Sequence, residues 1–126
     1  MATDTTGAAT VEFAIVGLFL CMVLAAIFDF GRLFWARNEL QFAVEEAERY
    51  VMVYTSASDT TVTTYLQGRV TGISTSSITV TITPETISSI NYKTVTATYS
   101  FQFLFIGLIR PEPVLIKATG RVPVVS

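Results

Sequence analysis

The sequence predicts an α+β fold in which one long N-terminal helix packs on a small antiparallel sheet of about three strands. The first observation is a helical pattern of apolar residues in a stretch without proline up to position 83. The second is a change, from position 77 onward, to alternation of apolar and hydroxyl residues, which is typical of strands. The third is the length of 126 residues, which suits one domain with an appended membrane segment.

The first helical stretch is apolar enough to enter a membrane. The run from Phe13 to Phe28 contains no charged residue and would extend about 24 Å as a helix, slightly short of a hydrocarbon core of about 30 Å. Adding residues 8–11 supplies the missing length but brings Glu12 into the segment. A charged side chain costs about 2.5–3.5 kcal/mol at the centre of a membrane helix and less near its end. We therefore expect a transmembrane half over residues 8–29.

The same helix continues to about Tyr54 as an amphipathic segment, the first part of a domain expected over residues 30–126. Apolar side chains recur every three or four residues and define one face, which suits packing against the sheet. We interpret Glu45, Glu46 and Glu48 as exposed charges rather than paired general acids. The apolar face comprises Leu33, Ala36, Leu40, Ala43, Val44, Ala47, Tyr50, Val51 and Tyr54.

A Ser/Thr-rich segment then predicts a short second helix. Asp59 is placed to cap its start, and the helix would run to about Gln67. Gly68 or Gly72 would end it, because glycine is common just after the last helical residue.

The last part of the chain predicts three strands. Residues 77–83 and 92–103 alternate apolar and mostly hydroxyl side chains, and residues 114–124 form a less regular third candidate. Such strands make an antiparallel sheet that is covered on one face, here by the amphipathic part of the long helix. Residues 84–91 and 105–113 are expected to be the connections. The apolar segment Phe101–Ile109, which leads into the second connection, is an interface candidate if the helix leaves it uncovered.

The composition excludes several classes of function. A net charge of −2 without a basic block gives nucleic-acid binding no electrostatic basis. The chain has no His, and its single Cys, Cys21, lies inside the apolar run. His-dependent acid–base catalysis, the usual zinc sites and an intrachain disulfide are thereby excluded. We expect no enzyme, no catalytic residue, no metal and no cofactor.

Four residues mark the expected membrane boundary. Asp29 and Arg32 are three residues apart on the helix and are expected to form a salt bridge there. Arg32, Trp35 and Arg37 either anchor at the lipid interface, where Trp and Arg are favoured, or contact a partner subunit. The sequence leaves both interpretations open.

Two consecutive segments resemble a known family. They are "GAATVEFAIVGLFL" and "IFDFGRLFWARNELQFAVEEAERYV", which together cover residues 7–51. The combination of G-A-A-x-V-E-F, a membrane run, F-G-R, a Trp and N-x-L-Q-x-A resembles the TadE-like pseudopilins of the tight-adherence (Tad, type IVc) pilus system. The resemblance implies a pilin-like fold.

The resemblance also implies specific roles for the first residues. In type IV pilins and pseudopilins, a membrane-bound prepilin peptidase cuts after a Gly that ends a short leader. Here the leader would be residues 1–7, with Gly7 before the cut and Ala8 as the new N-terminus. Glu12 would be the fifth residue of the processed chain, followed by Phe13. The carboxylate in that position helps subunits assemble, commonly by pairing with the N-terminal amine of a neighbour.

The implied function is assembly of a pilus involved in adhesion. Expected partners are other pilins and pseudopilins, the prepilin peptidase and the pilus assembly platform, within a homo- or hetero-oligomeric filament. The expected location is the bacterial inner membrane, crossed once, with the C-terminal domain outside the cytoplasm. The positive-inside rule applied to Arg32 and Arg37 alone favours the opposite orientation. The alternative function is an unprocessed, single-pass, membrane-anchored domain that binds a ligand at the cell surface.

Overall fold

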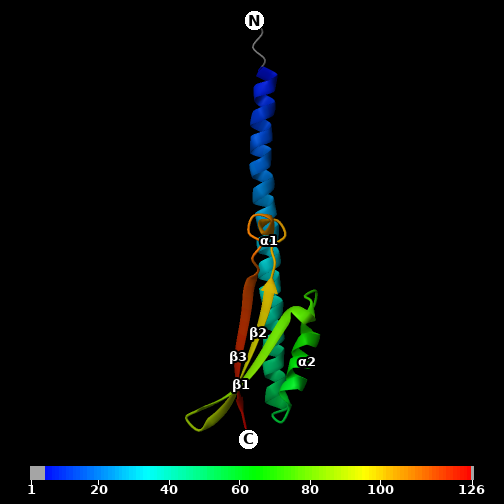
Figure 1. Ribbon diagram of the computed structural model, residues 1–126. Coiled ribbons are helices and arrows are strands. Elements are labelled where there is room, and N and C mark those ends of the chain that lie inside the picture. The colour runs from blue at the N-terminus through cyan, green and yellow to red at the C-terminus, as the bar shows by residue number, and fades with distance from the viewer. Residues whose placement is uncertain (1–4, 126) are drawn as a thin grey trace.

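One long helix carries a small α+β domain along its second half (Figure 1). The structure is a computed structural model that describes residues 5–125, so the first four residues of the expected leader lie outside the described residues. The elements are α1 (Thr5–Val53), α2 (Asp59–Arg69), the 3₁₀ turn η1 (Thr75–Ser77), β1 (Ile78–Ile87), β2 (Ile90–Phe101), the 3₁₀ turn η2 (Ile106–Leu108) and β3 (Val114–Val124). The α+β prediction of a long helix on three antiparallel strands is confirmed.

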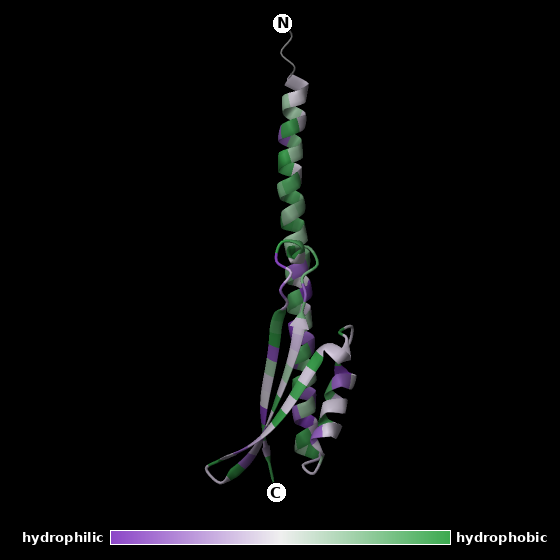
Figure 2. Ribbon diagram, in the orientation of Figure 1, coloured by the Kyte–Doolittle hydropathy of each residue, from purple (hydrophilic) through white to green (hydrophobic). Residues whose placement is uncertain are grey.

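The N-terminal half of α1 extends beyond the rest of the molecule (Figure 1). Its surface is apolar, as Figure 2 shows by the green colour of this half. None of the residues in its most apolar 18-residue window is buried, and the helix is long and apolar enough to cross a membrane. Exposed apolar surface of this extent is unfavourable in water, which fits a single-pass membrane anchor.

The sheet has the order β1-β2-β3 with antiparallel neighbours. Its register aligns apolar residues in rows across the three strands. One such row pairs Ile78 with Tyr99 and Tyr99 with Ile116, and another runs from Val80 through Ala97 to Ala118. Because side chains alternate along a strand, these rows face one side of the sheet, where α1 lies (Figure 1).

The hydrophobic core lies between α1, α2 and the sheet. Six residues of the predicted apolar face of α1 are buried in it, whereas Tyr54 is exposed. From α2, Val62 and Leu66 are buried beside them. The six residues of α1 are Ala36, Leu40, Ala43, Val44, Ala47 and Val51.

Two local predictions were wrong. Residues 84–91 are not a loose connection, because β1 and β2 continue through them to a two-residue turn, Ser88–Ser89, with φ values of 51° and 67°. Pro84 is tolerated there because β1 is an edge strand. The cap of α2 is Ser58, whose side chain accepts a hydrogen bond from the backbone N–H of Thr61, while Asp59 is the first helical residue.

Candidate functional site

The residues expected at the processing and assembly site lie at the exposed start of α1. Gly7, Ala8, Glu12 and Phe13 are all exposed, and Phe13 retains 79% of its accessible surface. Within residues 5–125, the carboxylate of Glu12 has no hydrogen-bond or ion-pair partner. The structure thus places an unpaired carboxylate on a helix surface that is otherwise apolar.

Asp29 lies where the apolar half of α1 meets the sheet domain, and its side chain is fully buried. Its Oδ2 accepts hydrogen bonds from the backbone N–H groups of Phe105 (2.9 Å) and Ile106 (2.8 Å). Its Oδ1 accepts a third from the N–H of Leu104 (3.1 Å). The carboxylate therefore fastens the connection between β2 and β3 to α1, across more than 70 residues of sequence.

Arg32 forms an ion pair with this carboxylate. Its Nη1 lies 3.7 Å from Oδ1 of Asp29, and its guanidinium lies 5.2 Å from the centre of the Phe101 ring. That nitrogen has no hydrogen-bond partner in the described structure. The Asp29–Arg32 contact is thus longer than the hydrogen bonds that Asp29 makes to the loop. Its main role is electrostatic, because it places the positive charge of Arg32 beside the buried carboxylate.

Aromatic rings complete the junction. Phe28 meets Phe105 edge to face with ring centres 6.0 Å apart, and Phe30 meets Phe103 in the same way at 5.9 Å. Edge-to-face pairs of this kind stabilise packing by about 0.5–1.5 kcal/mol beyond area burial. The aromatic pairs and the Asp29 hydrogen bonds fix where the loop sits along α1.

Sequence reasoning missed this arrangement. The predicted salt bridge between Asp29 and Arg32 is present, because spacing along a helix is visible in the sequence, but the hydrogen bonds from Asp29 to the loop were not predicted. The signal that could have revealed the loop was the combination of an acidic residue ending an apolar run with a distant apolar connection, residues 104–109, that needs hydrogen-bond acceptors.

Trp35 and Arg37 differ in their surroundings. The Trp35 ring packs directly over Gly72, which has a positive φ of 74° and no side chain that would collide with the ring. Nearby, Glu39 accepts a hydrogen bond from the N–H of Thr71 (3.2 Å), so both residues hold the segment after α2. Arg37 is exposed and has no ion-pair partner within residues 5–125. Their assignment to a membrane boundary stays a prediction.

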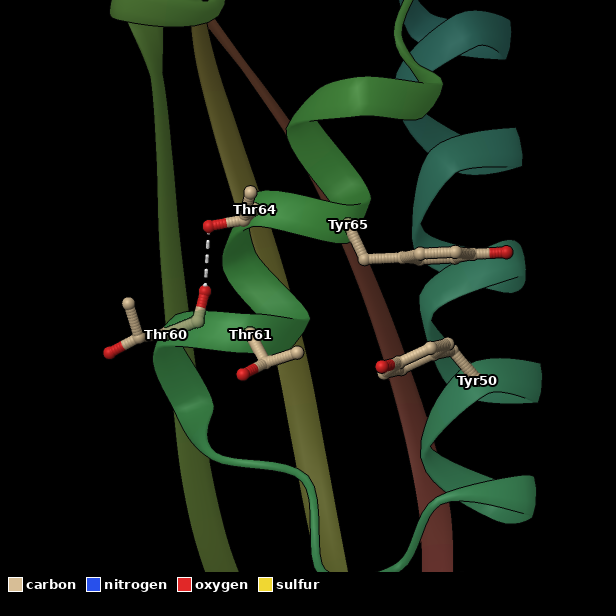
Figure 3. A pocket seen from close by; sticks show the side chains of 5 residues that line it. All are labelled: Tyr50, Thr60, Thr61, Thr64 and Tyr65. Atoms are coloured by element: carbon tan, nitrogen blue, oxygen red, sulfur yellow. Dashed lines mark hydrogen bonds between the residues drawn. The ribbon is translucent and has the colours of Figure 1, made fainter.

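An aromatic hollow of about 380 Å³ lies where α2 meets α1 (Figure 3). Tyr50 and Tyr65 stack there with ring centres 4.4 Å apart. Threonines of α2 line the rest, and Thr64 donates a hydrogen bond to the backbone carbonyl of Thr60 (2.9 Å). The residues that line the hollow offer hydroxyl groups and aromatic faces but no carboxylate or cation. The hollow is therefore a packing contact between α1 and α2, without an acid–base pair.

Glu46 and Glu48 are both partly buried, which corrects their placement among the exposed charges, whereas Glu45 is exposed as predicted. The Glu46 carboxylate pairs with Arg49 at 3.4 Å, and Glu48 contacts the sheet. Glu48 lies against Gly120 of β3, at a point where any side chain on β3 would collide with the carboxylate. Burial raises the pKa of Glu48 above its ordinary value of 4.5, and the neighbouring charge of Glu45 raises it further. A hydrogen bond from the backbone N–H of Arg121 acts in the opposite direction.

In the part of the chain that the structure describes, no group of three or more Cys, Asp or Glu side chains is arranged to hold a metal ion.

Comparison with known proteins identifies one relationship. The model of the family described as TadE-like protein matches residues 7–49. The matched segment includes the apolar half of α1, Asp29 and Arg32, and most of the amphipathic half. No curated protein and no solved structure gives a significant match.

Proposed function

We propose that this chain, a TadE-like protein of the Tad pilus system, is a pseudopilin that a prepilin peptidase processes and that assembles with other pilins. The family is one of Tad pilus-associated membrane proteins and is not an enzyme family. The apolar half of α1, residues 8–29, serves as a single-pass anchor in the bacterial inner membrane. Residues 30–126 form the domain outside the cytoplasm, and residues 1–7 form the leader.

The observation that carries the proposal is the unpaired carboxylate of Glu12 on an apolar, exposed helix. A charge in this position is unfavourable in lipid unless a partner group compensates it. Cleavage between Gly7 and Ala8 would create a positively charged amine four residues before Glu12. Between neighbouring subunits, this amine and the Glu12 carboxylate can pair, so that two charges in a low-dielectric helical core compensate each other.

The exposed surface of α1 supports assembly through the same helix. Phe13 and Phe19 retain more than half of their accessible surface, and the other large apolar side chains of residues 11–27 are exposed as well. Removal of subunits from the membrane would leave this surface in water unless other helices covered it. Packing of α1 helices in a filament core provides that cover, with the sheet domains on the outside.

Substitution of Glu12 tests the proposal in the native host. Glu12→Gln keeps the shape of the side chain but removes its charge, and Glu12→Ala removes both. We expect both variants to reach the membrane at wild-type levels and to be lost from the sheared filament fraction or from complexes with partner pilins. The control is Glu112→Gln, which removes an exposed charge of the β2–β3 connection.

Normal incorporation of both Glu12 variants would contradict the assembly role. It would favour the alternative, an unprocessed, membrane-anchored domain that binds at the cell surface, for which the Gly7–Glu12 spacing has no importance.

A further inference from the structure

The connection between β2 and β3 contains six consecutive residues without a polar side chain, Leu104–Ile109, here called the apolar loop. Several of its side chains are exposed, above all Leu108 and Ile109, which retain 84% and 85% of their accessible surface. Leu104 and Phe105 retain about half, at 55% and 46%. Surface loops of soluble domains are usually polar, so a contiguous apolar tip indicates contact with a further apolar phase.

The apolar loop lies beside the membrane half of α1 and not beside the sheet (Figures 1 and 2). Asp29 and Phe28 hold its first residues, as described above. Its tip then turns toward the N-terminal half of α1, where it forms one wall of an open groove of about 530 Å³. The groove is lined by Cys21, Met22, Ala25 and Ala26 of α1 and by Leu108 and Ile109, among others. Cys21 precedes Asp29 by about 12 Å along the helix axis, at about 1.5 Å per residue.

Most backbone N–H groups of the apolar loop have hydrogen-bond acceptors within the protein. The Asp29 carboxylate accepts hydrogen bonds from the backbone N–H groups of residues 104–106. Within the loop, the N–H of Leu108 donates to the carbonyl of Phe105 (3.2 Å), and the N–H of Ile109 donates to that of Ile106 (3.0 Å). The N–H of Arg110 donates to the same Ile106 carbonyl (2.8 Å). A loop can approach hydrocarbon only if such groups have internal partners.

From these three observations we propose that the apolar loop enters the lipid boundary on the sheet side of the membrane, as a second membrane contact beside α1. The inference rests on the proposed membrane anchoring of α1. The occupant of the groove is lipid, with acyl chains lying between Cys21 and Met22 on one side and Leu108 and Ile109 on the other. Arg110 and Glu112, exposed charges that follow the apolar loop, stay at the headgroup level.

Continuity with the anchor favours lipid over a protein partner. The groove opens onto residues of α1 that belong to the proposed span, so any lipid around the span also reaches the loop. An interfacial segment typically buries its apolar side to a depth of about 5–10 Å. The loop lies beside α1 between Cys21 and Asp29, a length of about 12 Å along the helix axis, so this depth is within its reach. In lipid, the backbone N–H groups of residues 104–106 would have no water to bond, and the buried carboxylate of Asp29 supplies their acceptors.

Site-specific fluorescence in membranes tests the proposal. The full chain would carry Cys21→Ser and one new cysteine, labelled with an environment-sensitive dye, in phosphatidylcholine vesicles with and without nitroxide-labelled lipid. The test positions are Leu108→Cys and Ile109→Cys. Ile87→Cys, exposed at the far tip of the β1–β2 hairpin, is the matched control in water, and Val16→Cys is the control within the anchor.

We expect the Leu108 and Ile109 probes to lose emission to the nitroxide lipid to an extent approaching the Val16 probe, while the Ile87 probe is unaffected. If Val16 is quenched and the loop probes behave like Ile87, the loop proposal is overturned and the anchor stands. If Val16 is also unquenched, the anchor fails and the loop proposal fails with it. If the loop probes escape quenching but shift to the blue as the protein-to-lipid ratio rises, a second copy covers the loop, which also overturns the proposal.

Discussion

Replacing Asp29 with Asn tests whether this carboxylate fastens the apolar loop to α1. The carboxylate accepts three backbone hydrogen bonds, and each bond to a charged acceptor stabilises by about 1.5–3 kcal/mol. An amide has one oxygen, which can replace Oδ2 and keep the bonds to residues 105 and 106. Its NH₂ group then faces the N–H of Leu104, which is left without an acceptor at a cost of about 1–3 kcal/mol. With the weakening of the two remaining bonds, we expect a loss of about 2–4 kcal/mol in the free energy of local opening.

Amide hydrogen exchange in detergent micelles measures this loss directly. At 1.4 kcal/mol per factor of ten, the amides of residues 104–106 should exchange about 30 to 700 times faster in Asp29→Asn than in the wild type. The β2 amides that pair with β3 should keep their protection, because the sheet does not depend on the loop. Glu112→Gln serves as the control and should leave all rates unchanged. Unchanged exchange at residues 104–106 in Asp29→Asn would refute the capping role.

Two further predictions concern the contact between α1 and β3. Because the pKa of Glu48 is raised, the folded state holds a proton that the unfolded state loses near the ordinary pKa of 4.5. The free energy of unfolding should therefore fall as pH rises from 4.5 through the raised pKa. In thermal unfolding measured across this pH range, Glu48→Gln should reduce the fall, whereas Glu112→Gln should leave it unchanged. Gly120→Ala should destabilise the domain by about 1–3 kcal/mol, because the new methyl group displaces Glu48 from the N–H of Arg121. The control is Gly68→Ala, in an open position of α2, which should stabilise the domain by about 0.5–1 kcal/mol. If Gly120→Ala and Gly68→Ala changed the free energy of unfolding in denaturant equally, the packing of Glu48 against Gly120 would be contradicted.

The elements of the fold could be predicted because each has a periodicity that is visible in the sequence. The long helix shows a continuous apolar run followed by a three- and four-residue spacing, and α1 indeed covers residues 5–53. The hydroxyl–apolar alternation indicated the inward faces of the strands, including Val95 and Ala97, which are both fully buried. The turn between β1 and β2 could not be predicted in the same way, because serine is not the residue expected at positive φ.

The contacts at the candidate site depend on residues far apart in the chain. Asp29 binds a loop more than 70 residues later, and Trp35 packs on Gly72, so neither contact leaves a local pattern. Glu48 was misplaced for a related reason: its charge indicates solvent, but it follows the buried Val44 by four residues, and Gly120 creates room for it against β3. Gly7 and Glu12 differ from these cases, because the role proposed for them rests on their spacing along the chain and needs no structure.

The measurement that tests the central claim most directly is the N-terminal sequence and intact mass of the protein recovered from its native membrane or filament. Processing after Gly7 predicts that the chain begins at Ala8, which makes Glu12 its fifth residue. A chain that still begins at Met1 or Ala2 would contradict processing and the pseudopilin role proposed for Glu12.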